Sequence, residues 1–326
     1  MEGPSGRGPV LSPYRGRARA AFYVLALGVL AVSSAAILIS LARAQGIPAL
    51  AIAALRMSVA AVVVVPIAVA GCREEIRCLR GADVLLAVGS GILLAMHFGF
   101  WISSLDATSV MSSVVLVSTN PVFVGLASAL ILRERPSAGA ILGIAVAVLG
   151  GAVVGAADLR SGGGATVRGD VLALLGALAA SGYLLIGRRL RRNMSLRLYI
   201  GITYLTAAVA LLAVVAITST PLAGAPVGGY LWVLLLAVGP QLLGHSSYNW
   251  ALKYVTATFV TVTLLAEPIG ATVLAIPILG QVPGPVRVAG GVLILAGVFL
   301  AARAEGKTVR GATLGAEDAH DSRRGV

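Results

Sequence analysis

The second half of this chain repeats the first at a constant offset of 147 residues, without a gap, from about residue 22 to about residue 304. Single identities carry little weight in a chain rich in Ala, Leu and Val, so prolines are the better markers. Pro121 aligns with Pro268, and Pro136 aligns with Pro283. Each copy holds five long apolar segments. This odd number constrains how two copies of one unit can be assembled.

The apolar segments place the chain in a physical class. Hydrophobic residues make up 58% of the sequence and charged residues only 12%, which is far from the composition of soluble domains. A helix needs roughly 20 apolar residues to cross a bilayer. Suitable runs lie at about 21–42, 48–70, 83–104, 108–132, 137–156, 170–187, 198–219, 229–251, 256–279 and 285–304. Because lipid offers the backbone no hydrogen-bond partners and the alternation of a membrane barrel is absent, the sequence predicts an all-α polytopic membrane protein with ten transmembrane helices.

The net charge of +12 has a distribution that argues against a nucleic-acid partner. Basic residues gather in alternate connections between the apolar segments, whereas the other connections are poor in them. The rich set is Arg15, Arg17, Arg19, Arg73, Arg77, Arg80, Arg133, Arg135, Arg188, Arg189, Arg191, Arg192, Arg197 and Lys253. Basic loops stay on the cytoplasmic side of a membrane. We therefore expect a multi-pass protein of the cell membrane (plasma or inner) with both termini in the cytoplasm.

An odd number of spans means that the second copy enters the membrane upside down relative to the first. Loop charge agrees: Arg133, Glu134 and Arg135 follow the fourth segment on the basic side, whereas their counterparts from Gln281 to Pro283 lie on the poor side. The fold class is thus two inverted five-helix repeats, an arrangement typical of secondary transporters. The predicted organisation is a cytoplasmic basic tail (1–20), a first repeat (21–157), a linker (158–168), a second repeat (169–305) and a disordered cytoplasmic tail (306–326).

Several motifs in this frame resemble one known family. They are similar, in the same order, to the motifs of EamA-type carriers of the drug/metabolite transporter superfamily in its ten-helix form. The matching stretches are 51–56 with its closing Arg56, 118–123, 132–136, Gly169–Asp170 and Glu267–Pro268. One departure is Gln281, where the family usually has a glutamate. The resemblance implies a carrier, commonly an exporter of amino acids, metabolites or small toxic compounds.

Charged residues inside apolar segments are costly in lipid and are therefore candidate functional residues. Glu267 is the acidic residue deepest in a predicted span, and Pro268 beside it favours a helix kink. Its carboxyl group is our candidate for proton coupling, with a structural carboxylate as the alternative. Arg56 is the basic residue deepest in a span. It either binds a substrate carboxylate or phosphate, neutralises Glu267 or braces helix ends.

Other polar and aromatic residues are candidates for lining a substrate cavity. His97 and Trp101 share a face of the third segment, and His245 and Asn249 share a face of the eighth, because each pair is four residues apart. The full set of cavity candidates is Arg56, His97, Trp101, Asn120, Gln241, His245, Tyr248 and Asn249. Asn120 occupies the repeat position of Glu267, and Pro121 after it is a second predicted kink. Hydrogen bonding between helices is the alternative role for the two histidines.

Motifs of soluble enzymes are missing from the sequence, which has no HExxH helix, GxSxG elbow or P-loop. We therefore expect no enzymatic activity, no cofactor and no metal site. The leading hypothesis is a proton-coupled or facilitative transporter of small metabolites, in particular an exporter of amino acids or related compounds and drugs, acting as a monomer or homodimer. A carrier of nucleotide-sugar-like or other anionic solutes and a membrane scaffold without transport are the alternatives. Substrate, direction and coupling ion stay open at this level.

Overall fold

The fold is seen in a computed structural model that describes residues 14–132, 138–162, 164–255, 257–300 and 303–304. The predicted tails, apart from the ends of their flanking helices, and the turn that contains Glu134 lie outside these residues. The helices are α1 (Tyr14–Ser33), α2 (Ala35–Ala44), α3 (Ala49–Gly71), α4 (Arg73–Arg77), α5 (Gly81–Ser104), α6 (Val110–Val117), α7 (Asn120–Leu132), α8 (Ala138–Gly162), α9 (Gly164–Leu190), α10 (Leu196–Ile217), α11 (Val227–Leu236), η1 (Ala237–His245), α12 (Ser246–Ala251), α13 (Ala257–Thr263), α14 (Ala266–Leu279) and a last helix, Pro285–Leu300.

The prediction of an all-α polytopic membrane protein is confirmed. Within the described residues, 8 helical segments are long and apolar enough to cross a bilayer, and they are joined by two shorter apolar helices, Ile141–Val154 and Pro285–Leu300. Large apolar side chains cover the outside of the bundle, for example Leu30 at 70% and Val148 at 64% exposure, as expected for a surface in contact with lipid. That the two shorter helices also cross the membrane, which would make ten spans, stays a prediction.

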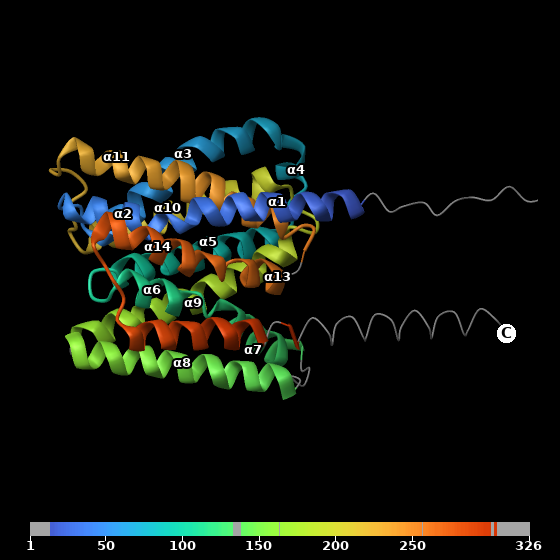
Figure 1. Ribbon diagram of the computed structural model, residues 1–326. Coiled ribbons are helices and arrows are strands. Elements are labelled where there is room, and N and C mark those ends of the chain that lie inside the picture. The colour runs from blue at the N-terminus through green and yellow to red at the C-terminus, as the bar shows by residue number, and fades with distance from the viewer. Residues whose placement is uncertain (1–13, 133–137, 163, 256, 301–302, 305–326) are drawn as a thin grey trace, which may run out of the picture.

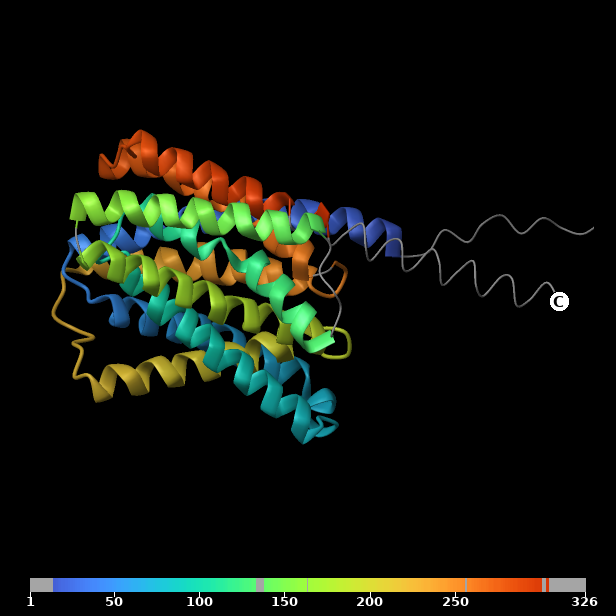
Figure 2. The ribbon, with the colours of Figure 1, turned by 90° about the horizontal axis from the view of Figure 1, so that it is seen from below.

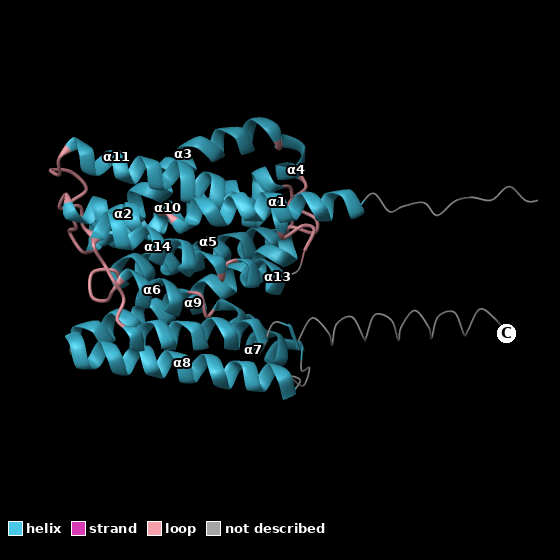
Figure 3. Ribbon diagram, viewed as in Figure 1, coloured by secondary structure: helices cyan, strands magenta, loops and turns pink. Residues whose placement is uncertain are grey.

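The course of the chain shows the inversion of the repeats. The helices run side by side in one bundle, and α1 begins at the same end of the bundle at which the last helix finishes (Figures 1 and 2). By contrast, α8 finishes at the opposite end, where α9 begins (Figure 1). The second repeat therefore starts at the end opposite to the first. Loops gather at the two ends of the bundle, apart from short interruptions inside it (Figure 3).

Helix contacts follow a pseudo-two-fold axis that relates the repeats. α3 packs along α10, and these two helices are each other's repeat equivalents. α5 of the first repeat packs along α9 of the second, while the equivalent pair, η1 and α1, also packs together. Each repeat therefore contacts the other through equivalent helices. The two repeats therefore form one core and not two separate domains.

Paired glycines bring α8 and the last helix into close contact. Gly150 and Gly297 occupy equivalent repeat positions in these helices. A Cβ atom on Gly150 would lie 2.6 Å from the backbone nitrogen of Ile294, and one on Gly297 would lie 2.6 Å from the carbonyl oxygen of Gly143. Only glycine permits this backbone approach, which is how small residues stabilise helix pairs in lipid without a hydrophobic driving force.

Two predicted spans are broken where the sequence indicates kinks. The fourth is divided into α6 and α7 at residues 118–119, and the ninth into α13 and α14 at residues 264–265. Pro121 and Pro268 lie in the first turns of α7 and α14. Proline has no N–H to donate, and its ring collides with the carbonyl of residue i−4, which weakens the preceding turn, although Pro66 stays inside the continuous α3. The kinks expected from these prolines are therefore complete interruptions at equivalent positions.

Two further segments differ from their expected form. The predicted flexible linker is helical where it is described, because α8 extends to Gly162 and α9 begins at Gly164. In the eighth span, nine residues form the π-helix η1, which includes Pro240. The wider π-helical turns commonly accompany functional sites. They also change which side chains of this span face the centre of the bundle.

Candidate functional site

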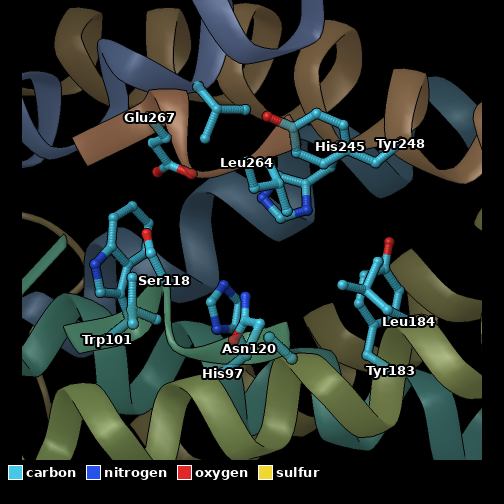
Figure 4. A pocket seen from close by; sticks show the side chains of 13 residues that line it. His97, Trp101, Ser118, Asn120, Tyr183, Leu184, His245, Tyr248, Leu264 and Glu267 are labelled. Carbon is cyan, nitrogen blue, oxygen red and sulfur yellow. The ribbon is translucent and has the colours of Figure 1, made fainter. Parts of the chain in front are cut away.

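A cavity of about 40 Å³ lies inside the bundle, next to the breaks in the fourth and ninth spans (Figure 4). Its walls are Val32, His97, Trp101, Val117, Ser118, Asn120, Ala180, Tyr183, Leu184, His245, Tyr248, Leu264 and Glu267. One water needs about 10–15 Å³ of such space, so the cavity has room for about three waters. The site is therefore narrow in this structure and must widen to admit a larger ligand.

The cavity lies on the pseudo-two-fold axis, because its walls include residues from equivalent positions of the two repeats. Val117 pairs with Leu264, Trp101 with Tyr248, and Asn120 with Glu267 at the same offset of 147 residues. Substrate sites of inverted-repeat carriers form at this repeat interface, often from interrupted helices. Both features are present here.

Glu267 is the cavity's acidic residue. It lies in the first turn of α14, directly after the break, and its carboxyl group points into the cavity (Figure 4). The side chain is 9% exposed. Within the part of the chain that the structure describes, it forms no salt bridge, including with Arg56. The carboxyl group is thus buried beside open space without a cationic partner in contact, a position from which it can bind a ligand.

Asn120, its repeat equivalent, has a structural role that the break creates. The orientation that satisfies its amide has the nitrogen donating to the carbonyl oxygens of Val117 and Ala177, both at 2.9 Å. Val117 is the residue four positions before Pro121, so its carbonyl is the one that the missing proline N–H leaves without a donor. Asn120 therefore caps the end of α6 and joins it to α9.

Aromatic and imidazole rings form another wall of the cavity. His97 stacks on Trp101 with 5.8 Å between ring centroids and an interplanar angle of 8°. The His97 Nδ1 atom lies 3.0 Å from the carbonyl oxygen of Gly176, so Nδ1 carries the proton and Nε2 is free to bond a ligand. His245 lies 6.2 Å from His97 and 5.6 Å from Tyr248, centroid to centroid. The two predicted histidines therefore meet across the repeat interface.

The π-helix explains why these histidines meet although they are out of register. By sequence offset His97 corresponds to Gly244, and His245 is one residue further on. His245 is the last residue of η1, whose wider turns rotate the following residues less than an α-helix does. This local change brings His245 to face His97.

Three of the fully buried polar atoms on the cavity walls have no hydrogen-bond partner. They are Trp101 Nε1, His245 Nδ1 and Tyr248 Oη. Buried polar groups in proteins are nearly always bonded, and leaving one unsatisfied costs about 1–3 kcal/mol. These atoms are therefore suited to bond a ligand or water held in the cavity.

Arg56, Gln241 and Asn249 lie outside the cavity wall. Arg56 is completely buried, donates through Nη2 to Gln241 Oε1 at 2.9 Å, and carries its guanidinium 4.0 Å from the centre of the Phe98 ring. Asn249 donates to Tyr183 Oη at 2.5 Å and to the carbonyl oxygen of His245 at 2.9 Å. Asn249 thus holds cavity residues in place from behind.

Sequence reasoning missed the contribution of α9 to the cavity. Ala180, Tyr183 and Leu184 line it from the sixth span, and Val32 lines it from the first. Tyr183 is the member of this group with a polar atom, and its phenol accepts from Asn249. The sequence signal for this role was a single tyrosine in an apolar span. Its repeat equivalent is Ala36, so the first repeat shows no polar residue at the matching position.

Comparison with known proteins identifies a family. The model of the EamA-like transporter family matches twice, at residues 20–156 and 167–303. An uncharacterized transporter of Clostridium kluyveri is 26% identical over 228 residues, which is 68% of this chain and 73% of that protein. A probable terminal-alkyne amino-acid exporter of Streptantibioticus cattleyicolor is 30% identical over 188 residues, 57% of this chain and 62% of that protein.

A solved structure supports the fold alone. It is titled only as the crystal structure of a protein, is 21% identical, and superimposes with a TM-score of 0.61 over 87% of this chain and 96% of its own. Three observations support the same conclusion: two tandem family matches, helices that suit a bilayer, and a cavity at the repeat interface. The chain is a membrane transporter and belongs to the EamA-like transporter family.

Proposed function

We propose that this transporter is a proton-coupled secondary carrier that exports amino acids or related small compounds. The observation that carries the proposal is Glu267, a buried carboxyl group without an ion-pair partner, at a helix break beside the cavity. The amino-acid exporter of Streptantibioticus cattleyicolor supports the substrate class through its name. Proton coupling and the direction of export are our proposals and are not taken from that relative.

The mechanism follows from the inverted repeats. Each repeat can adopt the conformation of the other, which opens the cavity first to one side of the membrane and then to the other. Glu267 exchanges a proton for the amine of the substrate, so that binding of one releases the other. A proton driven inward by the membrane potential supplies about 2.3 kcal/mol per 100 mV, enough to drive export against a gradient. Facilitative transport is the same cycle without this exchange.

The membrane and orientation are part of the proposal. We place the protein in the cell membrane with both termini in the cytoplasm, because the described basic connection that contains α4 lies at the end of the bundle at which α1 begins (Figure 1). The described start of α1 and the finish of the last helix share this end (Figure 1).

Transport of anionic, nucleotide-sugar-like solutes has weaker support. A solute that carries only negative charge would meet the acidic Glu267 with no amine to pair with it. Arg56 lies behind Phe98, and the charged residue on the cavity wall is the acidic Glu267. The wall composition thus favours a substrate with an amine.

Counterflow in proteoliposomes tests the proposal. Vesicles loaded with an unlabelled amino acid are expected to take up the same amino acid in labelled form. An imposed pH gradient is expected to concentrate the labelled amino acid inside the vesicles. Glu267→Gln should keep counterflow at a lower substrate affinity and lose the pH-driven concentration, because the amide cannot release a proton. Glu74→Gln, a change at an exposed residue of α4, is the matched control and should behave as wild type. pH-driven concentration by Glu267→Gln would contradict the assigned role.

A further inference from the structure

We infer that the substrate is held as a zwitterion between two buried charges, with its ammonium group at Glu267 and its carboxylate at Arg56, and that Phe98 covers Arg56 until the substrate arrives. This rests on the proposed amino-acid transport and specifies the chemistry of the same site. It also assigns a substrate contact to an arginine that the closed cavity does not reach.

The hydrogen bonding of Arg56 is incomplete. The side chain is 0% exposed, and only Nη2 has a bond, to Gln241, while Nε and Nη1 have no partner. No carboxylate among the described residues forms a salt bridge with it. A buried cation whose hydrogen bonds are incomplete and which no carboxylate contacts is unfavourable. A carboxylate supplies both, since it accepts several charge-assisted bonds from one guanidinium.

Gln241 adds a second donor at the same place. Its Oε1 accepts from Arg56, whereas its Nε2 is buried without a partner. Gln241 belongs to η1, the π-helical segment that also positions His245. Arg56 and Gln241 together therefore present three nitrogen atoms with free N–H groups from two helices. These are the groups that a carboxylate requires.

Phe98 contacts both this pair and the cavity wall. Its ring lies 4.0 Å from the Arg56 guanidinium, and its centroid lies 4.8 Å from that of His97 and 5.1 Å from that of His245. Both histidines line the cavity, whereas Phe98 and Arg56 do not. Because Phe98 contacts the guanidinium and two wall residues without lining the cavity itself, we place its ring between the open space and the unpaired donors. A rotation of this ring joins them when the closed cavity widens.

The opposite pole suits an ammonium group. Glu267 supplies the negative charge, and the Trp101 and Tyr248 rings flank the same cavity (Figure 4). Ammonium groups bind carboxylates and the faces of such rings. A zwitterion neutralises both buried charges at once. An analogue that lacks one of its charged groups leaves one pole unpaired.

Competition against labelled amino-acid counterflow tests the inference. The competitors are the parent amino acid, the amine without its carboxylate and the N-acetyl derivative without its ammonium group. For wild type we expect both analogues to compete at least about tenfold more weakly, because each leaves a buried charge unpaired. Arg56→Gln should lose the discrimination against the amine and keep that against the N-acetyl compound. Glu267→Gln should show the reverse.

Two more variants separate binding from general damage. Phe98→Ala uncovers Arg56, so we expect the parent amino acid to bind more tightly while the amine stays weak. Arg43→Gln is the control: it removes an arginine whose side chain is 34% exposed and paired with Asp106, and it should change neither ratio. Thermal unfolding in detergent verifies that each variant is folded.

The outcomes distinguish the inference from the proposed function. If wild type transports amino acids but the amine competes as well as the parent, the two-pole site is wrong while amino-acid transport stands. That wild-type result decides the matter even where Arg56→Gln fails to fold. A folded Arg56→Gln that still rejects the amine would also overturn the role of Arg56. Absence of any amino-acid counterflow would refute the proposed function itself.

Discussion

Replacing Asn120 tests how the break between α6 and α7 is stabilised. Its amide donates to the carbonyl oxygens of Val117 and Ala177 at 2.9 Å, and the side chain is 7% exposed. Hydrogen bonds between membrane helices average about 0.6 kcal/mol, and an unsatisfied buried polar group costs about 1–3 kcal/mol. We therefore expect Asn120→Ala to lower the free energy of unfolding by about 1–2 kcal/mol.

One of the two acceptors, the Val117 carbonyl oxygen, allows a more specific prediction. The Val117 carbonyl needs Asn120 because Pro121 has no N–H. In a Pro121→Ala background the new N–H at position 121 can donate to Val117, and Asn120 then has one bond fewer to contribute. The cost of Asn120→Ala should fall to about 0.5–1 kcal/mol, which gives a coupling energy of similar size in a double-mutant cycle.

Unfolding of the purified variants by titration with SDS in mixed micelles measures these free energies. Ser118→Ala is the control at the same break, because the Ser118 hydroxyl bonds back to Val114 in its own helix at 2.7 Å. It should change stability by less than about 0.5 kcal/mol. Equal costs of Asn120→Ala with and without Pro121 would refute the capping role.

Two further predictions concern packing and charge. Gly150→Leu should destabilise the protein by about 1–3 kcal/mol in the same SDS titration, because its Cβ would lie 2.6 Å from the Ile294 nitrogen. Gly151→Leu, whose Cβ would meet its nearest neighbour at 3.8 Å, should cost less, and equal costs would contradict close packing as the reason. Partial burial raises the pKa of Asp106 above its usual value, although the Arg43 guanidinium 2.5 Å away acts in the opposite direction. A raised folded-state pKa means that the folded protein holds this proton more tightly, so its stabilising effect is present at low pH and is lost as pH rises through the folded-state pKa. At neutral pH the free energy of unfolding of Asp106→Asn should therefore equal that of wild type or exceed it, by no more than about 1 kcal/mol because the side chain is partly exposed. In thermal unfolding this difference should shrink toward about pH 4, where the wild-type carboxyl group is also protonated. A clear loss of stability in Asp106→Asn at neutral pH would show that the ion pair dominates.

Much of the fold follows from features that the sequence shows directly. The 147-residue offset and the odd number of apolar segments in each copy predict inverted repeats, and the structure has them. Pro121 and Pro268 lie at the interruptions, because each removes one helix hydrogen bond and crowds the preceding turn. Asn120 and Glu267, one residue before these prolines, consequently lie at the cavity.

Other parts of the site depend on information that periodicity lacks. Nothing in an almost uniformly apolar helix tells which face meets the cavity, so Arg56 and Gln241 are indistinguishable by sequence from wall residues, although they lie behind Phe98. The π-helix shifts His245 into place by local hydrogen bonding that the sequence does not reveal. Tyr183 lies on α9, a helix that packs against helices of both repeats. Only the three-dimensional arrangement identifies it as a cavity residue.

The central claim is that the cavity between the repeats opens alternately to the two sides of the membrane. A single cysteine at Ser118, on the cavity wall and 4% exposed, tests it without knowledge of the substrate. Cys72 and Cys78, both free, are first replaced by serine. A membrane-impermeant thiol reagent is then applied to sealed vesicles of either orientation. Alternating access predicts that Ser118→Cys is labelled from both sides; labelling from only one side, or from neither, would contradict the account.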